Sequence, residues 1–230
     1  MRGLTLDFAT TPSATVLVLG AHSDDIEIGA GGTLRWLLRW APHVRIHWIV
    51  FAAAGQRQAE ATASANSLLG LGTQHHIRTF EFRDGFFPYE GSQIKDAFEV
   101  LKGSCSPDVI FTHHTGDLHQ DHRIIGELTW NTFRDHMILE YEVPKFDGGL
   151  VSPNFFVPLG EDIVNEKVRG LMEYFGSQRS KRWFSEDTFR GLMRLRGVEC
   201  QSASGYAEGF HCRKAVWSPP PTAALMGALL

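Results

Sequence analysis

The stretch "TVLVLGAHSDDIEIGAGG", residues 15–32, decides how this chain is expected to fold. It begins with a short apolar run that ends in glycine, which is typical of a strand buried on both faces of a parallel sheet. A histidine and two adjacent carboxylates, His22, Asp24 and Asp25, follow directly. Adjacent carboxylates repel each other, so something at this position must offset the repulsion.

Apolar runs and helical patterns alternate on both sides of this stretch. The predicted strands are 15–20, 44–53, 76–82, 108–112 and 137–143, and the predicted helices between them are 31–40, 57–69, 94–101 and 122–135. This order predicts an α/β fold, a Rossmann-like open parallel sheet flanked by helices on both faces.

The pattern is less regular in the last third of the chain, about 144–230. Two helices are expected there, at about 162–175 and 185–196, the second beginning at Ser185 and ending at Gly197. A last strand is expected at about 209–217. Because no linker divides the sequence, we expect a single domain over residues 1–230.

Composition and charge exclude several classes of protein. The 230 residues have a net charge of −4, spread along the chain, and no basic block indicates a nucleic-acid partner. We find neither a signal peptide nor an apolar run long enough to cross a bilayer. Three cysteines without a close pair indicate a reducing compartment, so we expect a cytoplasmic protein. The sequence indicates no role for the tail, 218–230.

Two loops carry unusual chemistry where predicted strands end. One is the His22–Asp25 segment, and the other is "HHTGDLHQDHR", residues 113–123, which holds four of the eleven histidines. In open α/β sheets, ligands bind at the carboxyl ends of the strands. We therefore expect the two loops to meet at one site.

The spacing within these loops suits a metal ion. His22 and Asp25 are three residues apart, as are His119 and His122, so each pair projects to one side of a helical turn. Histidine nitrogen and carboxylate oxygen are good Zn²⁺ ligands. A dication would offset the repulsion between Asp24 and Asp25. Adjacent residues face different ways, so one carboxylate is expected to bind metal and the other to lie beside the metal-bound water.

Simpler interpretations remain open at this point. Asp24 or Asp25 could only cap a helix, and a histidine-rich loop could only be solvated. Gly29, Gly31 and Gly32 could mark a dinucleotide-binding loop, but their spacing is not Gly-x-Gly-x-x-Gly.

The segments "AHSDDIEIGAGGTL" and "HTGDLHQDHR" together resemble the PIG-L/LmbE-like deacetylases. The resemblance is strongest over the first two thirds of the chain and is carried later by "YFGSQRSKRWF" and "GYAEGF". It implies a Rossmann-like fold and a zinc-dependent enzyme that removes acetyl groups from N-acetylglucosamine-type sugars. The family has proline where this chain has Ser23, a position without a ligand, so we expect only a local difference in the backbone.

The resemblance also implies roles for individual residues. Zn²⁺ is the expected cofactor, and Fe²⁺ is an alternative because two histidines and one aspartate suit both ions. The implied metal ligands are His22, Asp25 and His122; the implied catalytic residues are Asp24 as general base, His119 as oxyanion stabiliser or proton donor, and Asp121 as the partner that orients His119.

Three further residues are weaker candidates for substrate binding. Arg57 could hold a sugar hydroxyl or a phosphate, or only pair with Glu60 three residues later. Asp117 could bind a sugar hydroxyl or only form a turn. Glu208 resembles a late family motif that closes the site. The aromatic loop 84–91 could stack on a sugar ring or only pack.

The sequence therefore predicts a metal-dependent hydrolase that removes an N-acetyl group from an amino sugar or its conjugate by attack of a zinc-bound water. Hydrolysis of another amide or an ester is an alternative. A second alternative is a non-catalytic, Rossmann-like domain that binds a nucleotide sugar. The expected partner is a small N-acetylated amino-sugar substrate, and the resemblance extends the expectation to a homo-oligomer.

Overall fold

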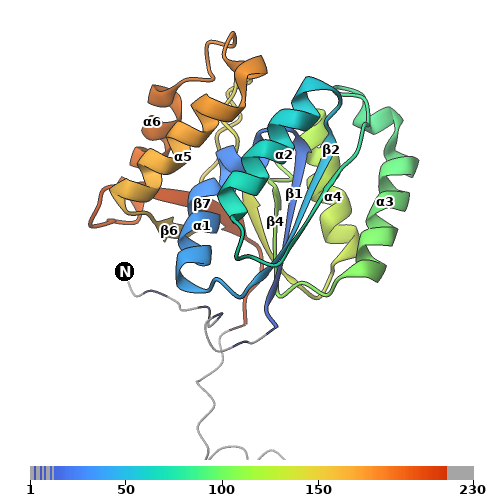
Figure 1. The fold of residues 1–230 in the computed structure, drawn as a ribbon, viewed down its shortest axis with the longest axis horizontal. Coiled ribbons are helices and arrows are strands. Elements are labelled where there is room, and N and C mark those ends of the chain that lie inside the picture. Colours follow the sequence, from blue (N-terminus) through green and yellow to red (C-terminus); the bar gives the residue numbers. More distant parts are fainter. Residues whose placement is uncertain (1–2, 4–5, 7, 9–10, 12, 217–230) are drawn as a thin grey trace, which may run out of the picture.

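The computed structural model describes residues 3, 6, 8, 11 and 13–216 and has an α/β fold. The described residues form a seven-stranded sheet with the order β3-β2-β1-β4-β5-β7-β6 (Figure 1). The strands are β1 Thr15–His22, β2 Arg45–Ala52, β3 His75–Thr79, β4 Val109–His113, β5 Met137–Tyr141, β6 Phe155–Pro158 and β7 Ala207–Cys212. The helices are α1 Asp25–Trp40, α2 Gln56–Leu69, α3 Gly91–Ser104, α4 Gln120–Thr132, α5 Glu161–Tyr174 and α6 Glu186–Glu199, with short 3-10 turns η1 Phe87–Tyr89 and η2 Gly176–Gln178.

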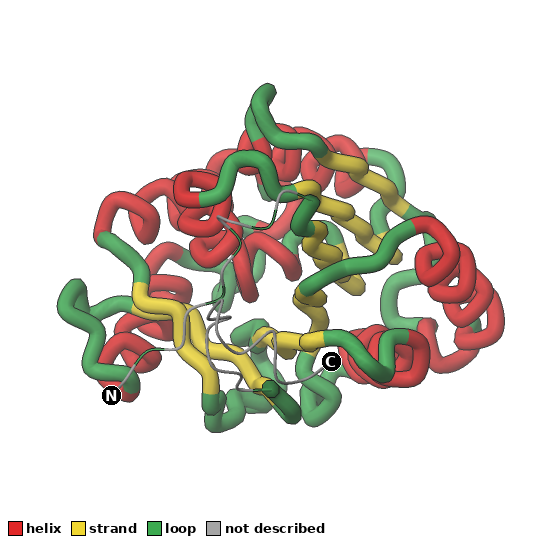
Figure 2. Tube along the Cα trace, turned by 90° about the horizontal axis from the view of Figure 1, so that it is seen from below, coloured by secondary structure: helices red, strands yellow, loops and turns green. Residues whose placement is uncertain are grey.

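The sheet is a layer between two groups of helices. Helices α3 and α4 pack on one face, and α1, α2, α5 and α6 pack on the other (Figure 1). The end-on view shows the same layering, with the strands between helices on both sides (Figure 2). The predicted fold class is confirmed.

Strand β1 explains why the opening apolar run specifies a central strand. Val16 and Val18 belong to the core cluster on the α1 side, whereas Leu17 and Leu19 belong to the cluster on the α3 side. Because successive side chains of a strand point to opposite faces, only an uninterrupted apolar run can fill both cores.

Strands β1 and β4 lie where the strand order reverses, and they separate toward their carboxyl ends. Their pairing ends at Val18 opposite Phe111, while β1 stays paired with β2 as far as His22 opposite Ala52. This is the topological switch point, where open α/β sheets form their ligand-binding crevice. The loops after β1 and β4 therefore border one crevice.

Helix α1 begins at Asp25, so the prediction of a start at Gly31 was wrong. Glycine disfavours a helix by roughly 1 kcal/mol relative to alanine, which placed the predicted start too late. Tertiary packing requires the glycines, because a Cβ atom at Gly29 would collide with the ring of Tyr141 and one at Gly32 would collide with Leu159.

The last third of the chain extends the sheet in a way that was only partly predicted. Strand β6 was not predicted. Strand β7 lies at 207–212, whereas the predicted strand was about 209–217. The last residue of that predicted range, 217, lies outside the described part of the chain. Strand β7 is antiparallel to both β5 and β6, so the sheet is mostly, not wholly, parallel.

Helices α5 and α6 are confirmed within one to three residues of the predicted bounds. The Ser185 side chain caps α6 by accepting a hydrogen bond from the Thr188 amide at 3.3 Å. Helix α6 continues past Gly197 to Glu199, so the predicted end at Gly197 was wrong. A Cβ atom at that position would collide with the Gly205 backbone, which explains the glycine.

We expect Gly29→Ala to lower the free energy of unfolding by about 1–3 kcal/mol, because the added methyl group would overpack the Tyr141 ring. Helix propensity alone predicts the opposite sign. Gly103→Ala in α3 is the matched control, since the space around its Cβ position is open, and it should be neutral or stabilising. Urea unfolding measures both, and a stabilised Gly29→Ala protein would contradict the packing argument.

Candidate metal centre and active site

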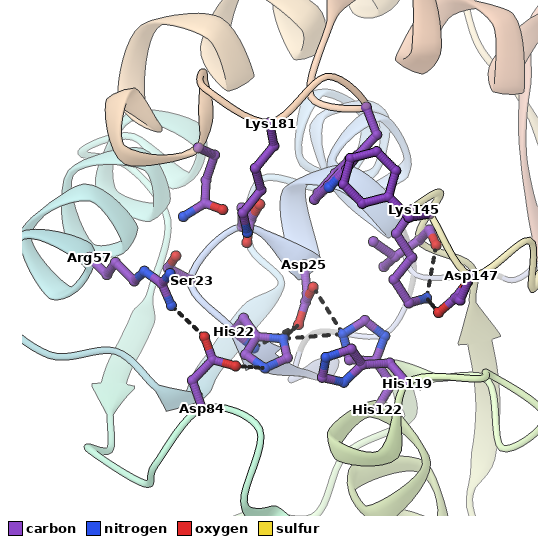
Figure 3. Close-up of a pocket in the computed structure, with 15 residues that line it drawn as sticks. His22, Ser23, Asp25, Arg57, Asp84, His119, His122, Lys145, Asp147 and Lys181 are labelled. Atoms are coloured by element: carbon purple, nitrogen blue, oxygen red, sulfur yellow. Dashed lines mark hydrogen bonds and ion pairs between the residues drawn. The ribbon is translucent and has the colours of Figure 1, made fainter.

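The loops after β1 and β4 bring His22, Asp25 and His122 together at the carboxyl ends of the strands (Figure 3). His22 Nδ1 lies 3.2 Å from His122 Nε2 and 3.2 Å from Asp25 Oδ2, and His122 Nε2 lies 3.4 Å from Asp25 Oδ1. Ligands at 2.0–2.1 Å from a tetrahedral Zn²⁺ lie about 3.3 Å from one another. The two histidine nitrogens, and each of them with one of the two Asp25 oxygens, therefore have separations close to those that one such ion needs.

A carboxylate holds the outer nitrogen of each of these two imidazoles. Asp121 Oδ2 lies 3.2 Å from His22 Nε2, and Asp117 Oδ2 lies 2.9 Å from His122 Nδ1. A proton held at the outer nitrogen leaves the lone pair of the inner nitrogen free. The inner nitrogens, His22 Nδ1 and His122 Nε2, are the two that lie 3.2 Å apart.

The charges of the cluster favour a cation at its centre. Burial opposes protonation of His22 and His122, yet the charge of Asp25 and the other carboxylates raises the pKa of both rings above the ordinary value. Burial also opposes ionisation of Asp25, but His122, His113 and His22 hold its pKa well below the usual range. A bound dication would take the place of these protons, so metal binding should strengthen as the pH rises.

Asp24 is buried at the first turn of α1, where its pKa is raised to about 6, first by burial and then by the neighbouring Asp25 charge. It occupies the N-cap position, but among the described residues its side chain makes no capping hydrogen bond. It instead lines a cavity of about 360 Å³ next to the cluster. These contacts favour a free carboxylate over the helix-cap interpretation.

His119 lines the same cavity and caps α4. Its ring packs edge-on against His22, with centroids 5.0 Å apart, and its Nδ1 accepts a hydrogen bond from the Asp121 amide at 3.3 Å. Burial, followed by the neighbouring His122 and His22, lowers the pKa of His119 and favours a neutral ring.

The predicted partner of His119, Asp121, has other contacts. Besides His22, its carboxylate accepts hydrogen bonds from the amides of Gly85 and Phe87 at 2.6 and 3.2 Å. The Asp121 carboxylate therefore links the cluster of histidines and carboxylates to the loop 84–91. The contact between Asp121 and His119 is made by the Asp121 backbone amide.

The three predicted substrate residues lie in different places. Arg57 lines the cavity and pairs with Asp84 at 2.6 Å (Figure 3). The Asp117 carboxylate is buried, with His122, Lys145 and the His119 amide as partners. Glu208 accepts hydrogen bonds at 2.7 Å from two amides in α1 and pairs with Lys167. The described residues that line the cavity include Arg57 but neither of the other two.

Several residues of the site were not singled out in the sequence. Asp84 is the first residue of the aromatic loop 84–91 and lies 3.2 Å from His22 Nε2. Lys181 and Trp183 line the cavity from the segment between α5 and α6, far along the chain. The one sequence feature that could have indicated Lys181 and Trp183 was the segment "YFGSQRSKRWF", which carried part of the family resemblance.

Other groupings of possible ligands overlap with the same cluster. Within the described residues, three sets bring one ligand atom of each residue within 4.8 Å of the others; they are His22 with His119 and His122, Asp25 with His113 and His122, and His22 with Asp84 and Asp121. The first two sets share His122 with the proposed centre. The third set lies at Nε2 of His22, the outer nitrogen, and so on the other side of that ring.

A Rossmann-like sheet with a histidine and carboxylate cluster at its switch point is the arrangement of a metal-dependent α/β enzyme. Residues 17–133, which are more than half of the chain, match the PIG-L family, described as GlcNAc-PI de-N-acetylase. The chain therefore belongs to the PIG-L family. This confirms the expected family and, with it, the class of enzyme, a deacetylase.

Individual relatives agree with this assignment. The chain is 26% identical over 183 residues to the uncharacterized deacetylase YaiS of Escherichia coli K12, covering 74% of this chain and 97% of that protein. The N,N'-diacetylchitobiose deacetylase from Pyrococcus horikoshii is 21% identical, with a TM-score of 0.69 over 90% of this chain and 86% of that chain.

The fold is also shared with an enzyme of another class. GalB, the 4-carboxy-2-hydroxymuconate hydratase from Pseudomonas putida KT2440, is 16% identical, with a TM-score of 0.68 over 91% of this chain and 100% of that chain. The fold alone therefore does not name the reaction, which has to be argued from the site. None of the helices in the described part of the chain has the length and apolar character to span a membrane.

Proposed function

We propose that this protein removes the N-acetyl group from an amino sugar or an amino-sugar conjugate, with one divalent metal ion held by His22, Asp25 and His122. The observation that carries the proposal is the spacing of their donor atoms, 3.2–3.4 Å, beside a cavity that Asp24 also lines. Zn²⁺ is the preferred ion and Fe²⁺ is the second choice, because the ligand types suit both.

The reaction assigns tasks to two side chains in the cavity, Asp24 and His119. The bound metal would polarise the acetyl carbonyl and acidify a water molecule. Ionised Asp24 accepts a proton from the attacking water while the new carbon–oxygen bond forms. A neutral His119 donates a hydrogen bond to the oxyanion. The carbon–nitrogen bond then breaks and the amine takes up the proton from Asp24, so that the products are acetate and the free amino sugar.

The wall of the cavity suits a sugar. Arg57 and Asp84 offer hydrogen-bond donors and acceptors of the kind that bind hydroxyl groups, and Trp183 offers an aromatic surface. The name of the chitobiose deacetylase describes an N-acetylated sugar substrate, which supports this choice. We keep Arg57 as a substrate-binding residue. The contacts of Asp117 favour a role in orienting His122, and those of Glu208 favour a role in joining α1 to β7.

Three further expectations remain predictions. The cytoplasmic location rests on the cysteine content, and the homo-oligomer rests on the family resemblance. The single domain is supported by the continuity of the sheet, because β6 and β7 extend the sheet that contains β1.

The first experiment measures the metal content of the untagged protein beside a His22→Ala, His122→Ala double variant. We expect about one divalent ion per chain in the wild type and little in the variant, as for a site with three protein ligands. Acetate release from N-acetylated amino sugars, its loss with a chelator and its return on adding Zn²⁺ then test the reaction. A wild-type protein that binds no metal and releases no acetate would contradict the proposal. Hydrolysis of other amides or esters alone would support the alternative substrate class.

A further inference from the structure

Glu60, in helix α2, is a buried carboxylate to which the proposed mechanism gives no task. Its side chain binds the 3-10 turn η2, 117 residues later in the chain. Oε1 accepts a hydrogen bond from the Ser177 amide at 2.9 Å, and Oε2 accepts one from the Ser177 hydroxyl at 2.5 Å. Gln56 Nε2 donates a third bond, to Oε1 at 2.9 Å. Glu60 therefore fastens η2 to α2.

The directions of the hydrogen bonds around Ser177 follow from the chemistry of the groups. Three donors surround Glu60, which suits an ionised carboxylate, and such a group only accepts. The Ser177 hydroxyl must therefore donate its single hydrogen to Glu60. The Ser177 oxygen can then only accept from its other neighbour, and Gln178 Nε2 donates to it at 2.9 Å. Glu60 thus decides, through Ser177, which end of the Gln178 amide faces Ser177.

The Gln178 side chain belongs to the wall of the catalytic cavity. It is only 2% exposed, yet it lines the cavity together with Lys181 and Trp183 of the same segment. Because Nε2 is directed at Ser177, the carbonyl oxygen Oε1 is fixed at the other end of the amide. Within the described part of the chain, Oε1 accepts no hydrogen bond, and it is not among the atoms sealed from solvent. An acceptor at the cavity wall is therefore left for a ligand.

We propose that Gln178 is a substrate-binding residue whose carbonyl oxygen accepts a hydrogen bond from a hydroxyl group of the sugar, and that Glu60 is the positioning residue that sets the direction of its amide. The inference rests on the deacetylation proposed above. The competing possibility is that Glu60 only fastens η2 to α2. In that case the direction of the Gln178 amide would have no effect on the reaction.

Glu60→Gln separates these two possibilities, because it keeps the size of the side chain and the acceptor for the Ser177 amide. Its new amide group would donate to the Ser177 oxygen, which releases the Ser177 hydrogen to Gln178 and reverses the Gln178 amide. An N–H group would then replace the acceptor in the cavity. We expect the KM for N-acetylglucosamine to rise roughly tenfold, as for one lost hydrogen bond. The kcat and the bound Zn²⁺ should stay within about twofold of the wild type.

A double variant tests whether Glu60 acts through Gln178. Gln178→Leu removes the acceptor and should raise KM by a similar factor, roughly tenfold. Adding Glu60→Gln to Gln178→Leu should raise KM no further, whereas independent effects would multiply to roughly a hundredfold. Glu173→Gln is the matched control, because it makes the same change of charge on the exposed surface of α5. It should behave as the wild type.

The 3-, 4- and 6-deoxy analogues of N-acetylglucosamine identify the hydroxyl group. The wild type should discriminate against one of the three, and Gln178→Leu should lose that discrimination, because the acceptor that reads the hydroxyl is gone. Equal kcat/KM of the wild type for all four sugars would contradict the proposed hydrogen bond.

Other results would also overturn the inference. They are a Glu60→Gln protein with the KM of the wild type, a double variant whose KM is the product of the single effects, and a loss of metal or kcat at unchanged KM. A wild-type protein that releases no acetate from any of these sugars would instead refute the proposed function. The two failures are therefore distinguishable.

Discussion

Asp24→Asn is expected to lower turnover by about 10²–10⁴-fold, the usual contribution of a general base, while the bound metal stays at about one ion per chain. Asparagine keeps the shape of the side chain but cannot accept a proton at neutral pH. The three proposed ligands are untouched by the change. Metal analysis and acetate release on the same sample measure both quantities.

The pH dependence supplies a second readout for the same variant. The pKa of Asp24 is raised to about 6, so the wild-type rate should fall as the pH drops through that value and the base becomes protonated. A bound dication stabilises the ionised carboxylate and moves this acid limb to a lower pH. Measured with enough Zn²⁺ to keep the site loaded, the residual activity of Asp24→Asn should lack the limb.

Asp135→Asn is the control for this experiment, because the Asp135 side chain is 92% exposed and outside the site. It should retain the rate and pH profile of the wild type. An Asp24→Asn protein with turnover close to that of the wild type would remove Asp24 from the mechanism, and loss of metal would reassign it as a ligand.

His122→Ala is expected to abolish both metal binding and turnover. It removes one of three proposed ligands, so the loss of Zn²⁺ affinity should exceed the roughly 10–100-fold change typical of a residue behind the ligands. It also leaves Asp117 buried with one charged partner fewer. Metal competition with a chromophoric chelator gives the affinity, and acetate release gives the rate.

His76→Ala is the matched control, because His76 is exposed on β3, away from the cluster. It should keep the metal and the activity. A His122→Ala protein that retains one tightly bound ion would mean that another of the overlapping ligand sets is used, such as one that includes His119. Circular dichroism of both variants separates loss of metal from loss of fold.

The central strands and the two polar loops could be predicted because the signals are local. The apolar run of β1 shows that the strand is buried on both faces, and the alternation of strands and helices indicates parallel pairing. The rule that loops at the carboxyl ends of such strands meet was enough to bring His22 and His122 together. Their separation of 3.2 Å came only with the fold.

Other features depend on partners that are distant in the sequence. The start of α1 was misplaced because the glycines oppose a helix locally, whereas their contacts with Tyr141 and Leu159 require them. Strands β6 and β7 pair antiparallel at the edge of the sheet, and strand pairing is set by hydrogen bonds between segments instead of by the pattern within either one.

By itself, the sequence determined the α/β class and the two loops that carry the chemistry, because hydrophobic periodicity and ligand types are properties of short segments. Only the tertiary structure decided which nitrogen of each histidine faces the cluster, that Asp121 and Asp117 hold the outer ones, and that Glu60 binds Ser177. The physical reason is that a hydrogen bond acts over about 3 Å. Its partners are known only once the chain has brought distant residues within that distance.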